Sequence, residues 1–108
     1  MNEIYTIDEI AAAVAPVSER YGIESIVLFG SYARGEATAK SDIDLLISYK
    51  RLTGAFALGG VYAELEEVLG KPVDVVSEKA LTADYADKHA RELLDAIRCE
   101  GVVIYRRG

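Results

Sequence analysis

The sequence predicts one α/β domain, in which amphipathic helices alternate with short apolar strands. The chain has 108 residues, of which 51% are hydrophobic, and this suits one compact core rather than a disordered or fibrous segment. Apolar residues recur with helical spacing in some segments, and apolar runs of strand length lie between them. There are no repeats, low-complexity tracts or linkers, so residues 1–108 are expected to form a single domain.

The first element is expected to be a helix that begins after Thr6, which has capping-box spacing to Glu9. Helical periodicity follows in the apolar residues Ile7, Ile10, Ala11, Val14 and Val17. Pro16 lies inside this pattern, so either the helix kinks there or a second turn begins with proline at its first position. Gly22 is a natural stop.

Two strands are expected next, over about residues 24–29 and 42–48, with a turn or short helix at residues 32–35 between them. A second helical stripe follows, formed by Leu58, Val61, Tyr62, Leu65, Val68 and Leu69. Gly70 closes this helix, whereas glycines 54, 59 and 60 leave its start open.

The last part of the chain is expected to hold a third strand and a last helix. The third strand spans Val73 to Val76, after Lys71-Pro72. The last helix is marked by Ala86, Ala90, Leu93, Leu94 and Ile97. Gly101 ends it, and residues 102–105 add either a strand or a short tail.

The loop between the first two strands carries a turn suited to phosphate and a pair of carboxylates. Gly30 and Ser31 break the apolar run that ends at Phe29, where backbone N–H groups and a hydroxyl could face phosphate oxygens. Asp42 and Asp44 open the next strand, and because strand side chains alternate, both carboxylates point to the same side. Two like charges so placed repel unless a cation lies between them. The loop indicates a metal-dependent nucleotidyl transfer site.

Other interpretations of the carboxylate pair are open. Asp42 could be a turn residue beside Ser41 and Asp44 a solvated strand position, although this leaves the Gly-Ser turn unexplained. In aspartyl-nucleophile phosphatases the carboxylates follow an apolar strand, whereas here the apolar run follows them. A calcium loop is disfavoured because no third Asp or Asn and no glycine stand at the required offsets after Asp44.

Asp74 is a third candidate ligand. It interrupts the apolar run from Val73 to Val76, and a carboxylate buried there is costly unless it is paired or metal-bound. If the third strand lies beside the second, Asp74 completes a triad of the kind that holds two divalent ions about 3.5–4 Å apart. The alternative is an edge position at which the side chain faces water.

The remaining polar candidates favour simpler interpretations. Arg34 and Lys40 flank the loop and could steady phosphates, but charged loop residues are usually only solvated. His89, the only histidine, is expected to be a partly exposed helix residue. Arg106 and Arg107 are expected to form a soluble tail.

Charge and composition limit the location and the partners. The net formal charge of −6 argues against binding of a long polynucleotide in a basic groove. Binding of a small nucleotide together with cations is compatible with this charge. A second substrate is expected on another protein, because the site and its supporting helices use nearly the whole chain. No apolar run approaches the roughly 20 residues of a membrane-spanning helix, and no signal-peptide pattern is found, so a cytoplasmic protein is expected. The single cysteine, Cys99, is expected to be a small buried residue.

The pattern Gly-Ser-x-Ala-Arg-Gly-x-Ala, followed by Ser-Asp-x-Asp-Leu, resembles the signature of minimal nucleotidyltransferases of the DNA polymerase beta superfamily, of the antitoxin type that accompanies HEPN toxins. Ten residues separate Ser31 from Asp42, and Pro-Val-Asp at 72–74 fits the third carboxylate of the family. The resemblance covers nearly the entire chain. It implies a polymerase-beta-like fold with a mixed sheet flanked by helices, ATP and magnesium as cofactors, and transfer of AMP to a tyrosine of the partner toxin.

The sequence therefore predicts a nucleotidyltransferase that assembles with a HEPN toxin and acts as its antitoxin. The expected nucleotide-binding residues are Gly30, Ser31 and Arg34, and the expected catalytic ligands of two magnesium ions are Asp42, Asp44 and Asp74. One alternative is an antitoxin that neutralises its partner by occlusion, without catalysis. The three carboxylates favour the enzyme over this alternative, because a protein that only binds has no need of three converging charges. Another is nucleotidyl transfer to a small molecule such as an antibiotic, or to RNA, which small size and acidity disfavour.

Overall fold

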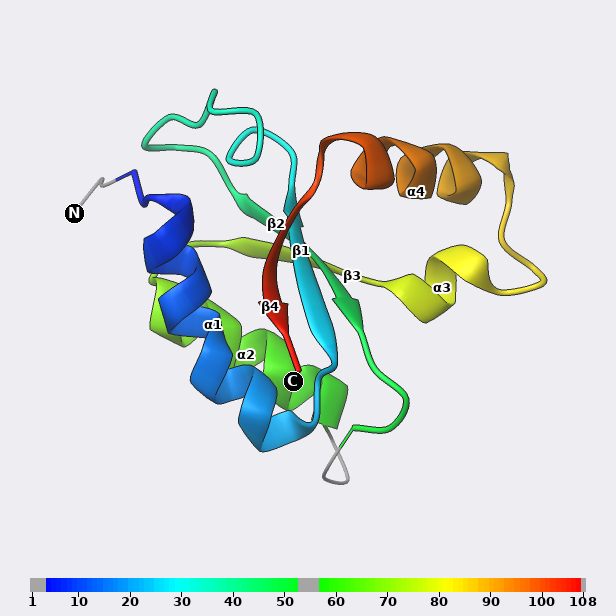
Figure 1. Cartoon of the computed structure of the whole chain (residues 1–108), viewed down its shortest axis with the longest axis horizontal. Helices are drawn as coiled ribbons and strands as arrows, with labels where there is room; N and C mark the ends of the chain where they lie inside the picture. The colour runs from blue at the N-terminus through cyan, green and yellow to red at the C-terminus, as the bar shows by residue number, and fades with distance from the viewer. Residues whose placement is uncertain (1–3, 53–56, 108) are drawn as a thin grey trace.

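A four-stranded mixed sheet with strand order β3-β2-β1-β4 forms the centre of the protein (Figure 1). The computed structural model describes residues 4–52 and 57–107. The strands are β1 (Ser25–Phe29), β2 (Ile43–Ser48), β3 (Val73–Ser77) and β4 (Val102–Arg106). β1 runs antiparallel to both β2 and β4, whereas β2 and β3 are parallel. The predicted mixed sheet and α/β class are confirmed.

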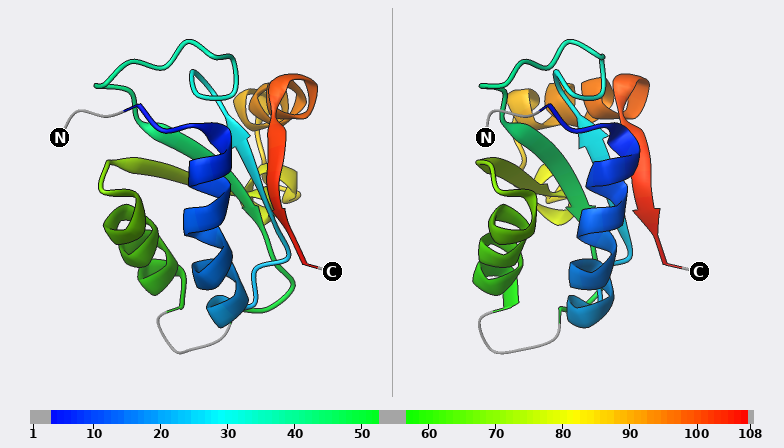
Figure 2. Two further views of the ribbon diagram at one scale, coloured as in Figure 1. Left: turned by 60° about the vertical axis from the view of Figure 1, so that its left-hand side comes forward. Right: turned by 90° about the vertical axis from the view of Figure 1, so that its left-hand side faces the viewer.

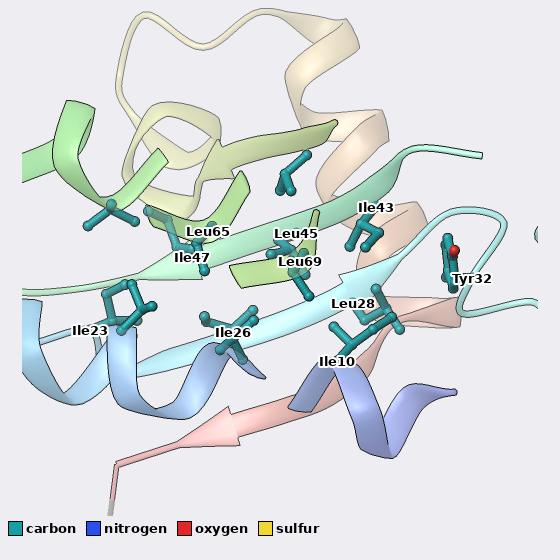
Figure 3. Close-up of a cluster of buried hydrophobic side chains, with 14 residues drawn as sticks. Ile10, Ile23, Ile26, Leu28, Tyr32, Ile43, Leu45, Ile47, Leu65 and Leu69 are labelled. Carbon is teal, nitrogen blue, oxygen red and sulfur yellow. The ribbon is translucent and has the colours of Figure 1, made fainter. Parts of the chain in front are cut away.

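Helices cover both faces of the sheet (Figure 2). One face carries α1 (Ile7–Tyr21) and α2 (Ala57–Leu69), and the other carries α3 (Glu78–Thr82) and α4 (Lys88–Glu100). Alternate residues of β2 fill the core between the sheet and α1 and α2, as Figure 3 shows for Ile43, Leu45 and Ile47. A second buried cluster on the other face contains Phe29, Leu46, Leu81, Leu94 and Ile97.

The helix α1 begins and ends at the predicted signals. The Glu9 N–H donates to the Thr6 hydroxyl at 3.0 Å, and the Thr6 N–H donates to the Glu9 carboxylate at 2.8 Å, which completes the capping box. Gly22 ends the helix with φ +79°. The helix runs unbroken through Pro16, so the alternative in which proline begins a second helical segment is wrong.

The structure adds to the predicted elements after residue 70 and corrects some of them. The short helix α3 was not predicted, because five residues are too few to show helical periodicity. The last helix begins at Lys88, where the Asp87 carboxylate accepts a hydrogen bond from the Ala90 N–H at 2.9 Å. Residues 102–106 form the edge strand β4, so Arg106 belongs to the sheet and not to a tail.

Two further expectations concern single residues and α2. Cys99 is exposed on α4, so its prediction as a buried residue is wrong. Gly59 and Gly60 lie inside α2, and Gly54 lies outside the described residues. Within residues 4–52 and 57–107, no helix combines the length and the apolar character needed to cross a membrane.

Candidate active site

The sheet brings the predicted phosphate turn and carboxylates to one end of three adjacent strands. Gly30 directly follows β1, whose last residue, Phe29, pairs with Asp44 of β2. Asp44 in turn pairs with Asp74 of β3 in parallel register. The third strand therefore lies beside the second, which is the condition under which Asp74 joins the other two carboxylates. Because Ile43 and Leu45 face the core beneath α1 and α2, Asp44 faces the opposite side of the sheet.

Gly30 and Asp44 lie in direct contact. Gly30 has φ +75°, a conformation that favours glycine, and a Cβ atom at this position would collide with the carboxylate oxygen Oδ2 of Asp44. Any larger residue would therefore have to push the carboxylate away. The turn and the carboxylate form one structural unit.

The turn after Gly30 exposes backbone donors. The Arg34 N–H donates to the Gly30 carbonyl at 3.1 Å, and the Glu36 N–H donates to the Ser31 carbonyl at 2.9 Å. Among the hydrogen bonds of the described residues, none uses the N–H groups at positions 31–33 as donors. Consecutive unpaired amides of this kind are suited to an anion such as a phosphate group.

The three carboxylates differ in exposure. Asp44 is partly buried, whereas Asp42 and Asp74 are exposed. The argument that Asp74 is costly to bury is therefore wrong, because β3 is an edge strand and Asp74 faces water. Burial raises the pKa of Asp44, and the negative charges of Asp74 and Asp42 raise it further. Both exposed carboxylates thus lie close enough to Asp44 to repel its charge.

The donor set fits a divalent cation in its chemistry. Carboxylate oxygens are the ligands that Mg²⁺ prefers, and a cation among the three aspartates would relieve the repulsion that raises the pKa of Asp44. Within the described part of the chain, however, no group of three or more His, Cys, Asp or Glu side chains is arranged so that it could hold a metal ion. The side chains would have to converge further to share an ion.

Arg34 is engaged by carboxylates on both sides. Its Nε donates to Glu36 at 2.8 Å, and its Nη1 lies 3.3 Å from the carboxylate of Glu100 at the end of α4. The hydrogen bond to Glu36, together with Glu100, raises the pKa of Arg34. Its positive charge also acts on Asp44, whose pKa it lowers, so Arg34 stands beside the site. A role in binding phosphate would require exchange of these carboxylate partners.

The other candidate residues from the sequence make no hydrogen bond or ion pair with the carboxylates or the turn in the described part of the chain. Lys40 is exposed, and its backbone N–H donates to the Thr38 hydroxyl at 3.3 Å. His89 is exposed on α4. A cavity of about 480 Å³, lined by Glu24, Ser25, Arg106 and Arg107, lies at the opposite end of β1 from Gly30.

Sequence reasoning missed Tyr32 and Lys71. The Lys71 ammonium donates to the Tyr32 hydroxyl at 2.8 Å, which joins the turn after β1 to the start of β3. Neither residue stands out by spacing or composition, since a lysine before proline and a tyrosine in a loop are both common. The contact exists because the crossover through α2 returns the chain beside β2.

The chain shares its sequence family and its fold with known proteins. The family model for the nucleotidyltransferase domain matches residues 12–98. The protein adenylyltransferase MntA of Thermococcus cleftensis is 32% identical over 93 residues, which cover 82% of this chain and 94% of that protein.

Solved structures with low sequence identity share the fold. A chain of a toxin–antitoxin crystal structure with AMP-PNP superposes with a TM-score of 0.68 at 20% identity and covers 90% of this chain and 73% of that one. The complex of tri-AMPylated HEPN toxin with MNT antitoxin from Shewanella oneidensis gives a TM-score of 0.64 at 17% identity, covering 94% of this chain and 74% of that one. With the family match over residues 12–98 and the Gly30 turn set against Asp44, the chain belongs to the nucleotidyltransferase domain family and is a nucleotidyltransferase.

Proposed function

We propose that this nucleotidyltransferase transfers AMP from ATP to a tyrosine hydroxyl of a HEPN toxin and thereby acts as its antitoxin. The observation that carries the proposal is the contact between Gly30 and Asp44, which sets a phosphate-binding turn against the carboxylates on β2 and β3. The name of the Thermococcus relative supports protein adenylylation, and the tri-AMPylated toxin in the Shewanella complex supports the acceptor.

In this proposal the turn binds the triphosphate. Phosphate oxygens accept hydrogen bonds from the amides at positions 31–33 and from the Ser31 hydroxyl. Gly30 has no side chain, so the backbone can approach the phosphate group closely. Two Mg²⁺ ions would be held by Asp42, Asp44 and Asp74, and when bound they would lower the pKa of the attacking hydroxyl and neutralise charge on the triphosphate.

Transfer is an in-line displacement at the α-phosphorus. A bond forms between the acceptor oxygen and the α-phosphorus, the bond to the bridging oxygen of pyrophosphate breaks, and the hydroxyl proton is lost to solvent. The chain contributes to catalysis mainly by positioning the reactants and by holding the charges that neutralise the phosphates. It can do so because one sheet carries the turn after β1 and the carboxylates at the starts of β2 and β3. We place the reaction in the cytoplasm, within a hetero-oligomer of this domain and the toxin.

An antitoxin that only occludes its partner is the second candidate. It would have no use for Asp44, whose partial burial beside two like charges raises its pKa and disfavours the ionised form. The presence of such a group favours catalysis. Transfer to RNA is disfavoured by the net charge of −6.

The test is incubation of the purified protein with α-labelled ATP, Mg²⁺ and a HEPN toxin expressed with it, followed by intact-mass measurement of the toxin. The expected result is label and AMP-sized mass increments on the toxin, absent when Mg²⁺ is chelated and absent with Asp44→Asn. Toxin that is fully neutralised without added mass would support occlusion instead. Label on RNA alone would show a different acceptor.

A further inference from the structure

Lys71 lies behind the phosphate turn, on the side of the sheet away from Asp44. Its Nζ donates to the Tyr32 hydroxyl at 2.8 Å and lies 5.4 Å from the centre of the Tyr32 ring and 5.8 Å from that of the Tyr5 ring. The Tyr5 hydroxyl donates to the Leu69 carbonyl at 2.6 Å, which fixes the second ring to the end of α2. The ammonium group therefore lies at the hydroxyl end of Tyr32 and close to a second ring that is anchored to α2.

Tyr32 connects this cluster to the turn itself. Its side chain is 4% exposed and belongs to the core beneath α1 and α2, where Figure 3 shows it beyond Leu28 and Ile43. Its backbone N–H lies in the middle of the three amides proposed to face phosphate, and its carbonyl accepts a hydrogen bond from the Gly35 N–H at 3.4 Å. Tyr32 thus has its side chain in the core and its backbone in the turn.

The segment from Lys71 to Asp74 contacts both the turn after β1 and the start of β2. Lys71 holds the turn through Tyr32, the Pro72 carbonyl accepts a hydrogen bond from the Ile43 N–H at 3.2 Å, and Asp74 pairs with Asp44. In sequence, Ile43 stands between Asp42 and Asp44 at the start of β2. Four consecutive residues therefore link the phosphate turn, the start of β2 and the third carboxylate.

An open space adjoins the turn on the side of the segment before α1. A cavity of about 220 Å³ lies between the turn and the segment before α1, and Tyr5, Tyr32, Gly35 and Ala37 contribute to its lining. This space allows the turn to shift if Tyr32 is released. The hydrogen bond from Lys71 is the polar contact that ties the Tyr32 side chain to the segment before β3.

We propose that Lys71 is a positioning residue for nucleotide binding, because it fixes the phosphate turn relative to the carboxylates through the Tyr32 hydroxyl. This inference rests on the proposed function. Lys71 itself does not touch the nucleotide, so its effect passes through Tyr32. Removal of either partner should therefore have the same consequence.

The experiment measures the Kd for ATP with Mg²⁺ by calorimetry, the KM and kcat of AMP transfer, and the Tm, for Lys71→Met, Tyr32→Phe and the double variant. Lys71→Met keeps the aliphatic stem, and Tyr32→Phe keeps the ring. Each single variant is expected to weaken ATP binding about tenfold, the size of one lost hydrogen bond to a charged group. The double variant should be no weaker than either single one, because both remove the same contact.

Two further variants serve as controls. Lys79 lies 4.5 Å from the centre of the Tyr49 ring and donates to the Lys50 carbonyl at 2.8 Å, at the end of β2 opposite Asp44. Lys79→Met should therefore leave the Kd unchanged. Lys71→Arg, which keeps a charged donor, should recover most of the affinity.

The outcomes separate this inference from the proposed function. If the wild type binds ATP and Lys71→Met and Tyr32→Phe lower the Tm without a change in Kd, the lysine is merely structural and the inference is wrong. Additive losses in the double variant would also overturn it, since Lys71 would then act by another route. If the wild type binds no ATP, the proposed function fails, and the inference fails with it.

Discussion

Asp44 is the residue at which folding and the proposed catalysis make opposite demands. Burial and the charges of Asp74 and Asp42 raise its pKa above the usual value of 3.8. Because the pKa is raised in the folded state, the stability that this group contributes is fully present below pH 3.8 and is lost as the pH rises through the folded pKa. At pH 7 the ionised side chain therefore destabilises the metal-free protein.

We expect Asp44→Asn to stabilise the metal-free protein at pH 7 and to lower AMP transfer at least about 100-fold, since a ligand and a charge are both lost. Urea unfolding at several pH values checks the first part. The stability difference between variant and wild type should shrink as the pH falls toward 3.8, where Asp44 becomes protonated. A variant that is less stable at every pH would contradict the electrostatic account.

Gly30 and Gly35 form a matched pair for testing the close contact of the turn with Asp44. Both have positive φ, +75° and +73°, but a Cβ atom at Gly35 meets nothing within 4 Å. Gly35→Ala should therefore cost about 1 kcal/mol of unfolding free energy from backbone strain alone. Gly30→Ala should cost more and should also weaken ATP binding, because the methyl group displaces Asp44. Equal effects of the two variants on stability and on ATP affinity would show that the contact is unimportant.

At the scale of elements, α2 carries two adjacent glycines in different surroundings. A Cβ atom at Gly59 meets nothing within 4 Å, whereas one at Gly60 would lie 2.6 Å from the Tyr21 hydroxyl on α1. The nearby carboxylate of Glu64 on α2 raises the pKa of Tyr21, so this hydroxyl lies beside a charged group that a displacement would change. The pair therefore separates helix propensity from packing between α1 and α2.

Gly59→Ala should stabilise the protein by about 0.5–1 kcal/mol, the usual gain for alanine over glycine within a helix. Gly60→Ala should gain less or destabilise, because the methyl group pushes Tyr21 away from Glu64. Thermal unfolding of both variants measures the difference. Equal stabilisation by the two would mean that Tyr21 moves aside without cost.

At the scale of the whole molecule, Asp74 separates catalysis from association with a partner. It is exposed on the edge strand β3, so Asp74→Ala should leave the fold intact. We expect the variant to bind the toxin with unchanged affinity and to leave it unmodified and active. Pull-down, intact-mass and toxicity measurements on the same variant check this. Full protection by Asp74→Ala without added AMP would contradict the enzymatic proposal.

The sequence predicted the elements up to β3 better than it predicted those that follow β3. Alternation along β2 and the break at Gly30 are local signals, so the turn and the Asp42–Asp44 pair could be found without knowing the sheet order. Asp74 was identified for a wrong reason, because its apolar neighbours indicated burial while its edge position leaves it in water. The hydrogen bond between Lys71 and Tyr32 could not be predicted from the sequence, because it depends on the crossover that brings two distant segments together.

The central place of β1 has a consequence for the order of folding. Leu28 pairs with Leu45 on one side and with Val102 on the other, so one neighbour lies near in the chain and the other far away. Since closing a longer loop costs more entropy before its contacts form, the β1–β2 hairpin is a natural nucleus and β4 joins late. Until β4 docks, the apolar edge of β1 is open to pairing with another chain. Docking of β4 therefore closes this edge of β1, and β4 becomes the edge strand of the completed sheet.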